Sequence, residues 1–137
     1  MHRAIGPTSH GILDYCFAIL IAIAPGVVGF SGRQARWCYI FAAIIVVLAL
    51  LTRYPLGAFR QVGFISHGVI ELLLGIVMLV LPWIAGFSAG VLSRNFYMAM
   101  GVLLIAIWAL TDFRGVRSAR PAAAPAPAAP QAPPPKP

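Results

Sequence analysis

The chain has 137 residues, of which 61% are hydrophobic and only 9% are charged. Soluble domains carry about 25% charged residues, so this composition excludes an ordinary water-soluble protein and indicates one whose solvent is lipid. The formal net charge is +7. Since the sequence contains no basic domain with interleaved aromatic residues, we expect this charge to set membrane topology, with the lipid bilayer as partner and no nucleic acid.

Four apolar runs follow one another along the chain and predict four transmembrane helices. They span residues 9–30, 37–52, 63–87 and 95–111. The first and third are long enough to cross about 30 Å of hydrocarbon, whereas the second and fourth, at roughly 16 residues, are near the lower limit. The first run contains Asp14, and its basic n-region is only "MHR", which is not typical of a cleaved signal peptide. The predicted fold class is an all-α membrane protein.

The first and third runs are copies of one another. The segment "SHGILDYCFAILIAIAPGVVGFS", residues 9–31, returns as "SHGVIELLLGIVMLVLPWIAGFS", residues 66–88, and Asp14 aligns with Glu71. Weaker matches continue beyond it, with Thr52 aligning with Thr111. This pattern predicts two duplicated helical hairpins with pseudo-twofold symmetry along the membrane normal.

The repeat divides the chain into four parts. Residues 1–8 form a short cytoplasmic N-terminus, 9–56 the first two-helix repeat and 57–113 the second. Residues 114–137 form a Pro/Ala-rich cytoplasmic tail that includes "ARPAAAPAPAAPQAPPPKP". Such proline density predicts disorder, either as a spacer or as a ligand for an aromatic-lined groove.

The basic residues are unevenly distributed between the two ends of the predicted helices. One end holds three, Arg33, Arg36 and Arg94. The other end holds seven, namely Arg3, Arg53, Arg60, Arg114, Arg117, Arg120 and Lys136. Because positive charge is retained in the cytoplasm, we expect a multi-pass protein of the bacterial inner membrane with both termini cytoplasmic.

Two matching stretches resemble a known family signature. They are "LPWIAGF", residues 81–87, and more weakly "APGVVGF", residues 24–30, which are similar to the motif of the SPW repeat family. The serine of that motif is replaced by Leu81 and Ala24, and the tryptophan of the first copy by Gly26. The resemblance implies a small bacterial integral membrane protein with two degenerate copies of a two-helix unit, and it implies no particular biochemical role.

The Pro-x-x-x-Gly-Phe-Ser element recurs where each repeated helix ends. We expect the proline to loosen the last turn, the glycine to end the helix with positive φ and the aromatic residues to anchor that end at the lipid interface. A gating hinge is the alternative. The residues are Pro25, Gly29, Phe30, Pro82, Trp83, Gly86 and Phe87.

The Ser-His-Gly-x-x-Asp/Glu element carries the candidate site. Thr8 or Ser9, and likewise Ser66, suit helix N-caps.

His10 and Asp14 are four residues apart on one helical face, as are His67 and Glu71. The pseudo-twofold would bring His10 to face Glu71 and His67 to face Asp14. Such a polar cluster is compatible with structural pairing, with a proton or cation pathway, or with a metal or haem site.

The leading functional prediction is a non-enzymatic scaffold or accessory subunit that forms a homo-oligomer or binds another membrane protein. The first alternative is a small proton- or cation-coupled transport assembly, and the second is a haem- or metal-binding redox protein. No catalytic residue, resident metal or cofactor is predicted, since no nucleophile elbow, phosphate loop or zinc-protease motif occurs. Cys16 and Cys38 lie in opposite halves of the membrane, which excludes a disulfide between them.

Overall fold

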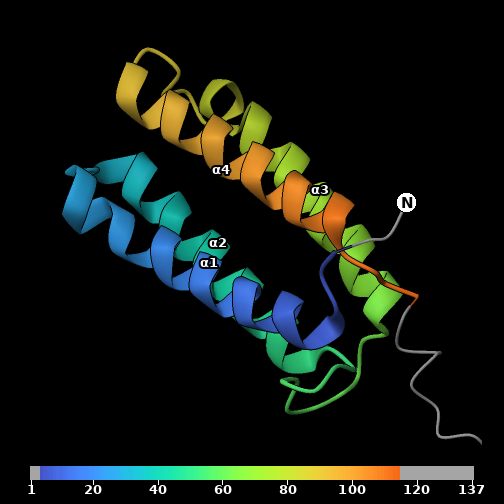
Figure 1. Ribbon diagram of the computed structural model, residues 1–137. Coiled ribbons are helices and arrows are strands. Elements are labelled where there is room, and N and C mark those ends of the chain that lie inside the picture. The colour runs from blue at the N-terminus through green and yellow to red at the C-terminus, as the bar shows by residue number, and fades with distance from the viewer. Residues whose placement is uncertain (1–3, 115–137) are drawn as a thin grey trace, which may run out of the picture.

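Four α-helices form two hairpins that lie side by side (Figure 1). The computed structural model describes residues 4–114, so most of the predicted tail lies outside the described residues. The helices are α1 (Pro7–Val28), α2 (Gly32–Leu51), α3 (Phe64–Ile84) and α4 (Val91–Leu110). Each is long and apolar enough to cross a membrane, and the described residues form no strand beyond isolated bridges. The predicted all-α class is confirmed.

The second and fourth helices are longer than the apolar runs indicated. Each has 20 residues, because it begins several residues earlier and includes arginines in its first turns. Arginine is tolerated there since its guanidinium reaches back to the helix end. Arg33 donates to the carbonyl of Ala85 at 3.2 Å, and Arg94 donates to that of Ser88 at 3.4 Å.

The predicted N-caps are wrong. Gly6 and Gly63 occupy the N-cap positions of α1 and α3, and neither helix has a side-chain cap. In α1, Pro7 begins the helix because its fixed φ is already helical and its missing N–H is not needed in the first turn. Ser66 consequently lies inside the first turn of α3, where it is exposed.

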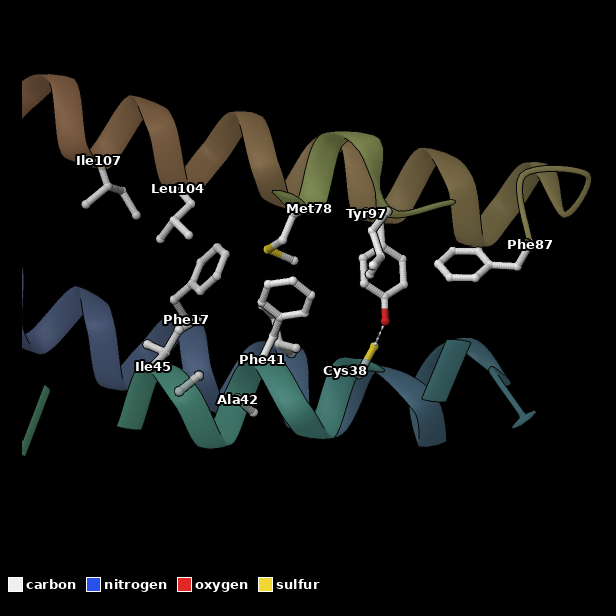
Figure 2. Packing of buried hydrophobic residues seen from close by; sticks show 13 residues of the cluster. Phe17, Cys38, Phe41, Ala42, Ile45, Met78, Phe87, Tyr97, Leu104 and Ile107 are labelled. Atoms are coloured by element: carbon white, nitrogen blue, oxygen red, sulfur yellow. Dashed lines mark hydrogen bonds between the residues drawn. The ribbon is translucent and has the colours of Figure 1, made fainter. Parts of the chain in front are cut away.

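Small residues let α3 and α4 approach closely, and large residues fill the space between the hairpins. A Cβ atom on Gly101 of α4 would lie 2.8 Å from the carbonyl oxygen of Gly75 of α3, so glycine permits this approach. Between the hairpins, Figure 2 shows Phe17 and Phe41 packed toward Met78 and Leu104, all of them buried. Many large apolar side chains outside this core are exposed, as expected for a surface that contacts lipid.

Backbone bridges tie the chain together at the end where α1 and α3 begin. Ile5 pairs with Thr111, so the segment before α1 crosses to the end of α4, as Figure 1 shows. Val62, before α3, pairs with Thr52, after α2. The two bridges join residues that correspond in the repeat, which is the pattern that a twofold relation would produce. The axis along the membrane normal stays a prediction.

Candidate functional site

Four ionisable side chains meet between α1 and α3. His10 and Asp14 lie one turn apart on α1, and His67 and Glu71 lie one turn apart on α3. None of the four is more than 3% exposed. The repeat places both pairs at the same distance from the helix starts, and the structure brings all four together.

The imidazole Nε2 atoms form the centre of this group, which we call the His–carboxylate cluster (His10, Asp14, His67 and Glu71). The two Nε2 atoms are 3.0 Å apart. His10 Nε2 lies 3.3 Å from Glu71 Oε2, and His67 Nε2 lies 3.3 Å from Asp14 Oδ2, as the sequence predicts. Each histidine also approaches the acid on its own helix, at 3.4 Å for Asp14 and 3.9 Å for Glu71. The direct contact between the two histidines was not predicted.

Threonine hydroxyls fix which ring nitrogen of each histidine carries hydrogen. His10 Nδ1 is 2.8 Å from Thr111 Oγ1, and His67 Nδ1 is 2.8 Å from Thr52 Oγ1. Each hydroxyl donates its one hydrogen to the carbonyl oxygen four residues earlier, at 2.7 Å for Thr111 and 2.6 Å for Thr52. The hydroxyl can therefore only accept from the imidazole, so Nδ1 carries hydrogen in both rings.

This arrangement leaves a lone pair on each Nε2 of the neutral rings. The two lone pairs then face one another, with carboxylate oxygens around them. These acceptors repel one another unless a positive charge lies between them. Among the described residues, neither carboxyl oxygen of Glu71 has a hydrogen-bond partner, although both are buried. This arrangement can accommodate a proton or a metal ion.

Three aromatic rings cover the cluster at the end of the bundle. Phe64 and Phe113 meet the His10 ring edge-on, with ring centres 5.3 and 5.4 Å away. Tyr54 stacks on Phe64 at 5.9 Å and lies 6.0 Å from the His67 ring. We call Tyr54, Phe64 and Phe113 the aromatic lid. The lid places apolar surface between the cluster and the end of the bundle at which α1 and α3 begin.

The glycines of the repeated Ser-His-Gly element make room for the lid. A Cβ atom on Gly11 would collide with the Tyr54 ring, and one on Gly68 would lie 2.7 Å from the Phe113 ring. Tyr54 follows α2 as Phe113 follows α4, so the two aromatic residues correspond in the repeat. The repeated glycine is thus explained by the aromatic residue that closes each half.

The two halves of the lid differ by one hydroxyl group. Tyr54 donates to Asp14 Oδ2 at 3.3 Å. Burial and the neighbouring Asp14 carboxylate raise the pKa of the Tyr54 hydroxyl, so it stays a donor. Phe113 has no hydroxyl to offer Glu71. This difference explains why the Glu71 carboxyl lacks the partner that Asp14 has.

The cluster has the ligand types and spacing of a small metal site. His10, Asp14 and His67 each offer one atom such that all three atoms lie within 4.8 Å of one another. A haem does not fit between the two imidazoles, because the carboxyl groups of Asp14 and Glu71 occupy the space that a macrocycle would need.

The Pro-x-x-x-Gly-Phe-Ser residues lie at the opposite end of the bundle from the cluster. Gly29 and Gly86 have φ of 82° and 71°, the left-handed conformation that ends each helix. Trp83 is exposed, as an interfacial anchor would be. Phe87, by contrast, is buried against Tyr97 rather than facing lipid as expected, and Phe30 packs on Phe96.

The thiols of Cys16 and Cys38 are both free, and Cys38 is buried. Tyr97 donates its hydroxyl hydrogen to the carbonyl of Gln34 at 2.6 Å, so the Cys38 thiol, 3.2 Å away, donates to Tyr97 (Figure 2). This contact joins α2 to α4 across the hairpins and has no counterpart in the other half.

Sequence analysis did not assign Thr52, Thr111, Tyr54 and Phe113 to the site. A signal was present for each pair, because a threonine ends each second helix and an aromatic residue follows two positions later in both copies. The backbone bridges that bring these residues beside the histidines cannot be read from the sequence, so the sequence alone did not predict their position.

The comparisons with known proteins agree with the repeat. No curated protein and no solved structure matches the chain. The sequence does match the SPW repeat domain over residues 8–119, which includes all four helices and the whole cluster. The chain therefore belongs to the SPW repeat domain family.

Proposed function

We propose that the protein is a non-enzymatic membrane protein whose four helices enclose a cation-binding centre at the His–carboxylate cluster. The single observation that supports this role is the approach of two Nε2 atoms to 3.0 Å while both Nδ1 atoms are held by threonine. A cluster meant only to join helices would place donors opposite acceptors. Here four acceptors converge, and the complementary group is a cation.

Infrared spectroscopy of the purified protein in nanodiscs, with elemental analysis of the same sample, tests this proposal. If a proton occupies the centre, the spectrum should show a protonated-carboxyl band above the amide I band when the proton is on Asp14 or Glu71, or imidazolium ring bands when it is on Nε2, and the carboxyl band should be lost in Asp14→Asn or Glu71→Gln. If a metal occupies it, the metal should be found in stoichiometric amount. Asp112→Asn, which removes the third acidic residue of the chain, is the matched control. Ionised carboxylates together with two neutral imidazole rings and no bound metal would overturn the proposal.

Cation-coupled transport is the second candidate function. A surface pocket of about 470 Å³ is lined by Arg53, Tyr54, Pro55 and Arg60. Tyr54 also donates to Asp14, so this residue contacts both the pocket and the cluster. A turn of the Tyr54 ring would connect the two.

Proteoliposomes with an internal pH or metal indicator separate this role from static binding. Transport predicts a flux that His67→Gln abolishes and that His2→Gln, which removes the histidine outside the cluster, leaves unchanged. A parent protein without flux would assign the centre to static binding or to an accessory role beside a membrane partner.

The proposed location is the bacterial inner membrane, with both termini and the loop after α2 in the cytoplasm. The uneven distribution of arginine supports this orientation. Ala89 and Ala58 are exposed at opposite ends of the bundle and provide a matched pair of labelling sites. An impermeant maleimide should label Ala89→Cys, but not Ala58→Cys, in intact cells. Labelling of Ala58→Cys alone would reverse the orientation.

A further inference from the structure

We propose that the cation is a divalent transition-metal ion of the zinc class, held by Nε2 of His10 and His67 and by carboxylate oxygens of Asp14 and Glu71. This inference rests on the proposed cation-binding role and specifies its ligand. It draws on the distances within the cluster, its charge and the partners of its ligands.

The spacing of the ligand atoms matches a small tetrahedral site. Metal–ligand bonds of about 2.0–2.1 Å place the corners of a tetrahedron about 3.3 Å apart. The Nε2 atoms are 3.0 Å apart. His10 Nε2 lies 3.4 Å from Asp14 Oδ1, and His67 Nε2 lies 3.3 Å from Asp14 Oδ2, so the two rings approach different oxygens of this carboxylate. Glu71 Oε2 is 3.3 Å from His10 Nε2 and 3.9 Å from that of His67. Rotations of the Asp14 and Glu71 carboxyl groups would bring one oxygen of each to the two remaining corners of a tetrahedron, and among the described residues no hydrogen bond holds the Glu71 carboxyl in place.

The charge of the ligand set selects a divalent ion. Two neutral imidazoles and two carboxylates carry two negative charges, which one divalent cation cancels. A neutral centre is the least costly in a hydrocarbon environment, whereas a monovalent ion would leave one charge uncompensated. Asp14 and Glu71 are the only acidic residues within the four helices, so the balance is set by the cluster itself.

The ligand types and their outer partners favour zinc-class ions over magnesium and calcium. Magnesium and calcium require about six or more oxygen ligands, and the cluster offers two carboxylates beside two nitrogens. Ligating histidines usually donate their second ring N–H to an oxygen that orients them. Thr52 and Thr111 accept these hydrogens, and Tyr54 orients the Asp14 carboxylate.

Metal titration of the full chain in nanodiscs tests this inference. After removal of bound metal by a chelator, Co²⁺ is added as a spectroscopic probe, followed by Zn²⁺. We expect one Co²⁺ per chain with the intense visible bands of a tetrahedral site, displaced by Zn²⁺ and unaffected by Mg²⁺. His67→Gln and Glu71→Gln should remove this spectrum, whereas His2→Gln should retain it.

Thr52→Val provides a variant that keeps every proposed ligand. It should weaken Zn²⁺ binding by about 10- to 100-fold while retaining the tetrahedral Co²⁺ spectrum, since only the orientation of His67 is lost. Circular dichroism of each variant establishes that the helices are present.

Three outcomes would overturn the inference. They are a folded parent that binds neither ion, binding that depends on His2 instead of His67, and an octahedral Co²⁺ spectrum. If the parent binds no metal but shows the protonated-carboxyl band, the metal assignment fails and the cation-binding role stands. Absence of metal, of that band and of imidazolium bands overturns the cation-binding role itself.

Discussion

Thr52 Oγ1 lies 2.8 Å from His67 Nδ1, and this contact joins the residue after α2 to the first turn of α3. The same contact recurs between Thr111 and His10, after α4 and in α1. The threonine that ends the second helix of each half thus orients the histidine of the other half. The two oriented rings meet between the hairpins, so the ends of α2 and α4 determine how the cluster forms.

We expect Thr52→Val to destabilise the protein by about 1–3 kcal/mol, because the buried N–H of His67 loses its acceptor. Thr8→Val is the matched control, since Thr8 is exposed on α1 and should change stability by less than about 0.5 kcal/mol. Unfolding by denaturing detergent measures both. Equal losses in the two variants would contradict the orienting role of Thr52.

Gly11→Ala should destabilise the protein by about 1–3 kcal/mol, because the added methyl group collides with the Tyr54 ring of the lid. Gly26, also on α1, faces open space, and a Cβ atom there would have no neighbour within 4 Å. Gly26→Ala should therefore be neutral, or stabilising by up to about 1 kcal/mol through helix propensity. Tryptophan fluorescence during detergent unfolding reports both changes. A neutral Gly11→Ala would show that the lid does not pack on this glycine as described.

Because Phe113 lacks the hydroxyl group that Tyr54 has, exchanging these residue types at the two positions should have opposite effects on the free energy of unfolding. Tyr54→Phe should cost about 1–3 kcal/mol, since the Asp14 carboxyl loses its donor. Phe113→Tyr should stabilise the protein by about 0.5–1.5 kcal/mol by giving Glu71 the partner that Asp14 has. Both changes keep the ring and its packing. Unfolding free energies of the two variants against the parent test the prediction, and a loss in both would contradict it.

His10 and Glu71 should behave as a coupled pair. His10→Leu removes one nitrogen from the cluster and should cost about 1–3 kcal/mol, as should Glu71→Leu. The double variant should lose less than the sum, by about 0.5–3 kcal/mol. Tyr97 lies near the opposite end of the bundle. The losses in free energy of unfolding caused by Tyr97→Phe and His10→Leu should therefore be additive within about 0.5 kcal/mol. Strict additivity of His10→Leu and Glu71→Leu would show that the two residues do not interact.

Much of the fold follows from the sequence. The apolar runs indicated four helices because lipid imposes one length and one composition on every spanning segment. The repeat then placed His10 opposite Glu71 and His67 opposite Asp14, because equivalent positions on α1 and α3 lie at equal depth. The helix starts were misjudged, since an arginine in the first turn interrupts an apolar run without ending the helix.

The parts that sequence analysis missed depend on loops. Tyr54 and Phe113 cover the cluster because the residues just after α2 and α4 pass beside the segments that lead into α3 and α1, and the backbone bridges that fix this arrangement carry no side-chain signal. Phe87 packs in the core because its short loop returns it to Tyr97, whereas Trp83 remains exposed on the helix. The acids and histidines could be predicted as a site because they are polar residues within apolar runs. Which ring nitrogen carries hydrogen could not be predicted from the sequence.

The most direct test of the proposed cation-binding centre is ¹⁵N nuclear magnetic resonance of the histidine rings in lipid. It is recorded on His2→Gln so that only His10 and His67 contribute. We expect Nδ1 to carry hydrogen in both rings, with or without added Zn²⁺, and we expect Zn²⁺ to shift both Nε2 resonances together. An Nδ1 without hydrogen in either ring would contradict the threonine contacts. The lone pairs would then no longer converge, and the reason for a cation at the centre of the protein would be lost.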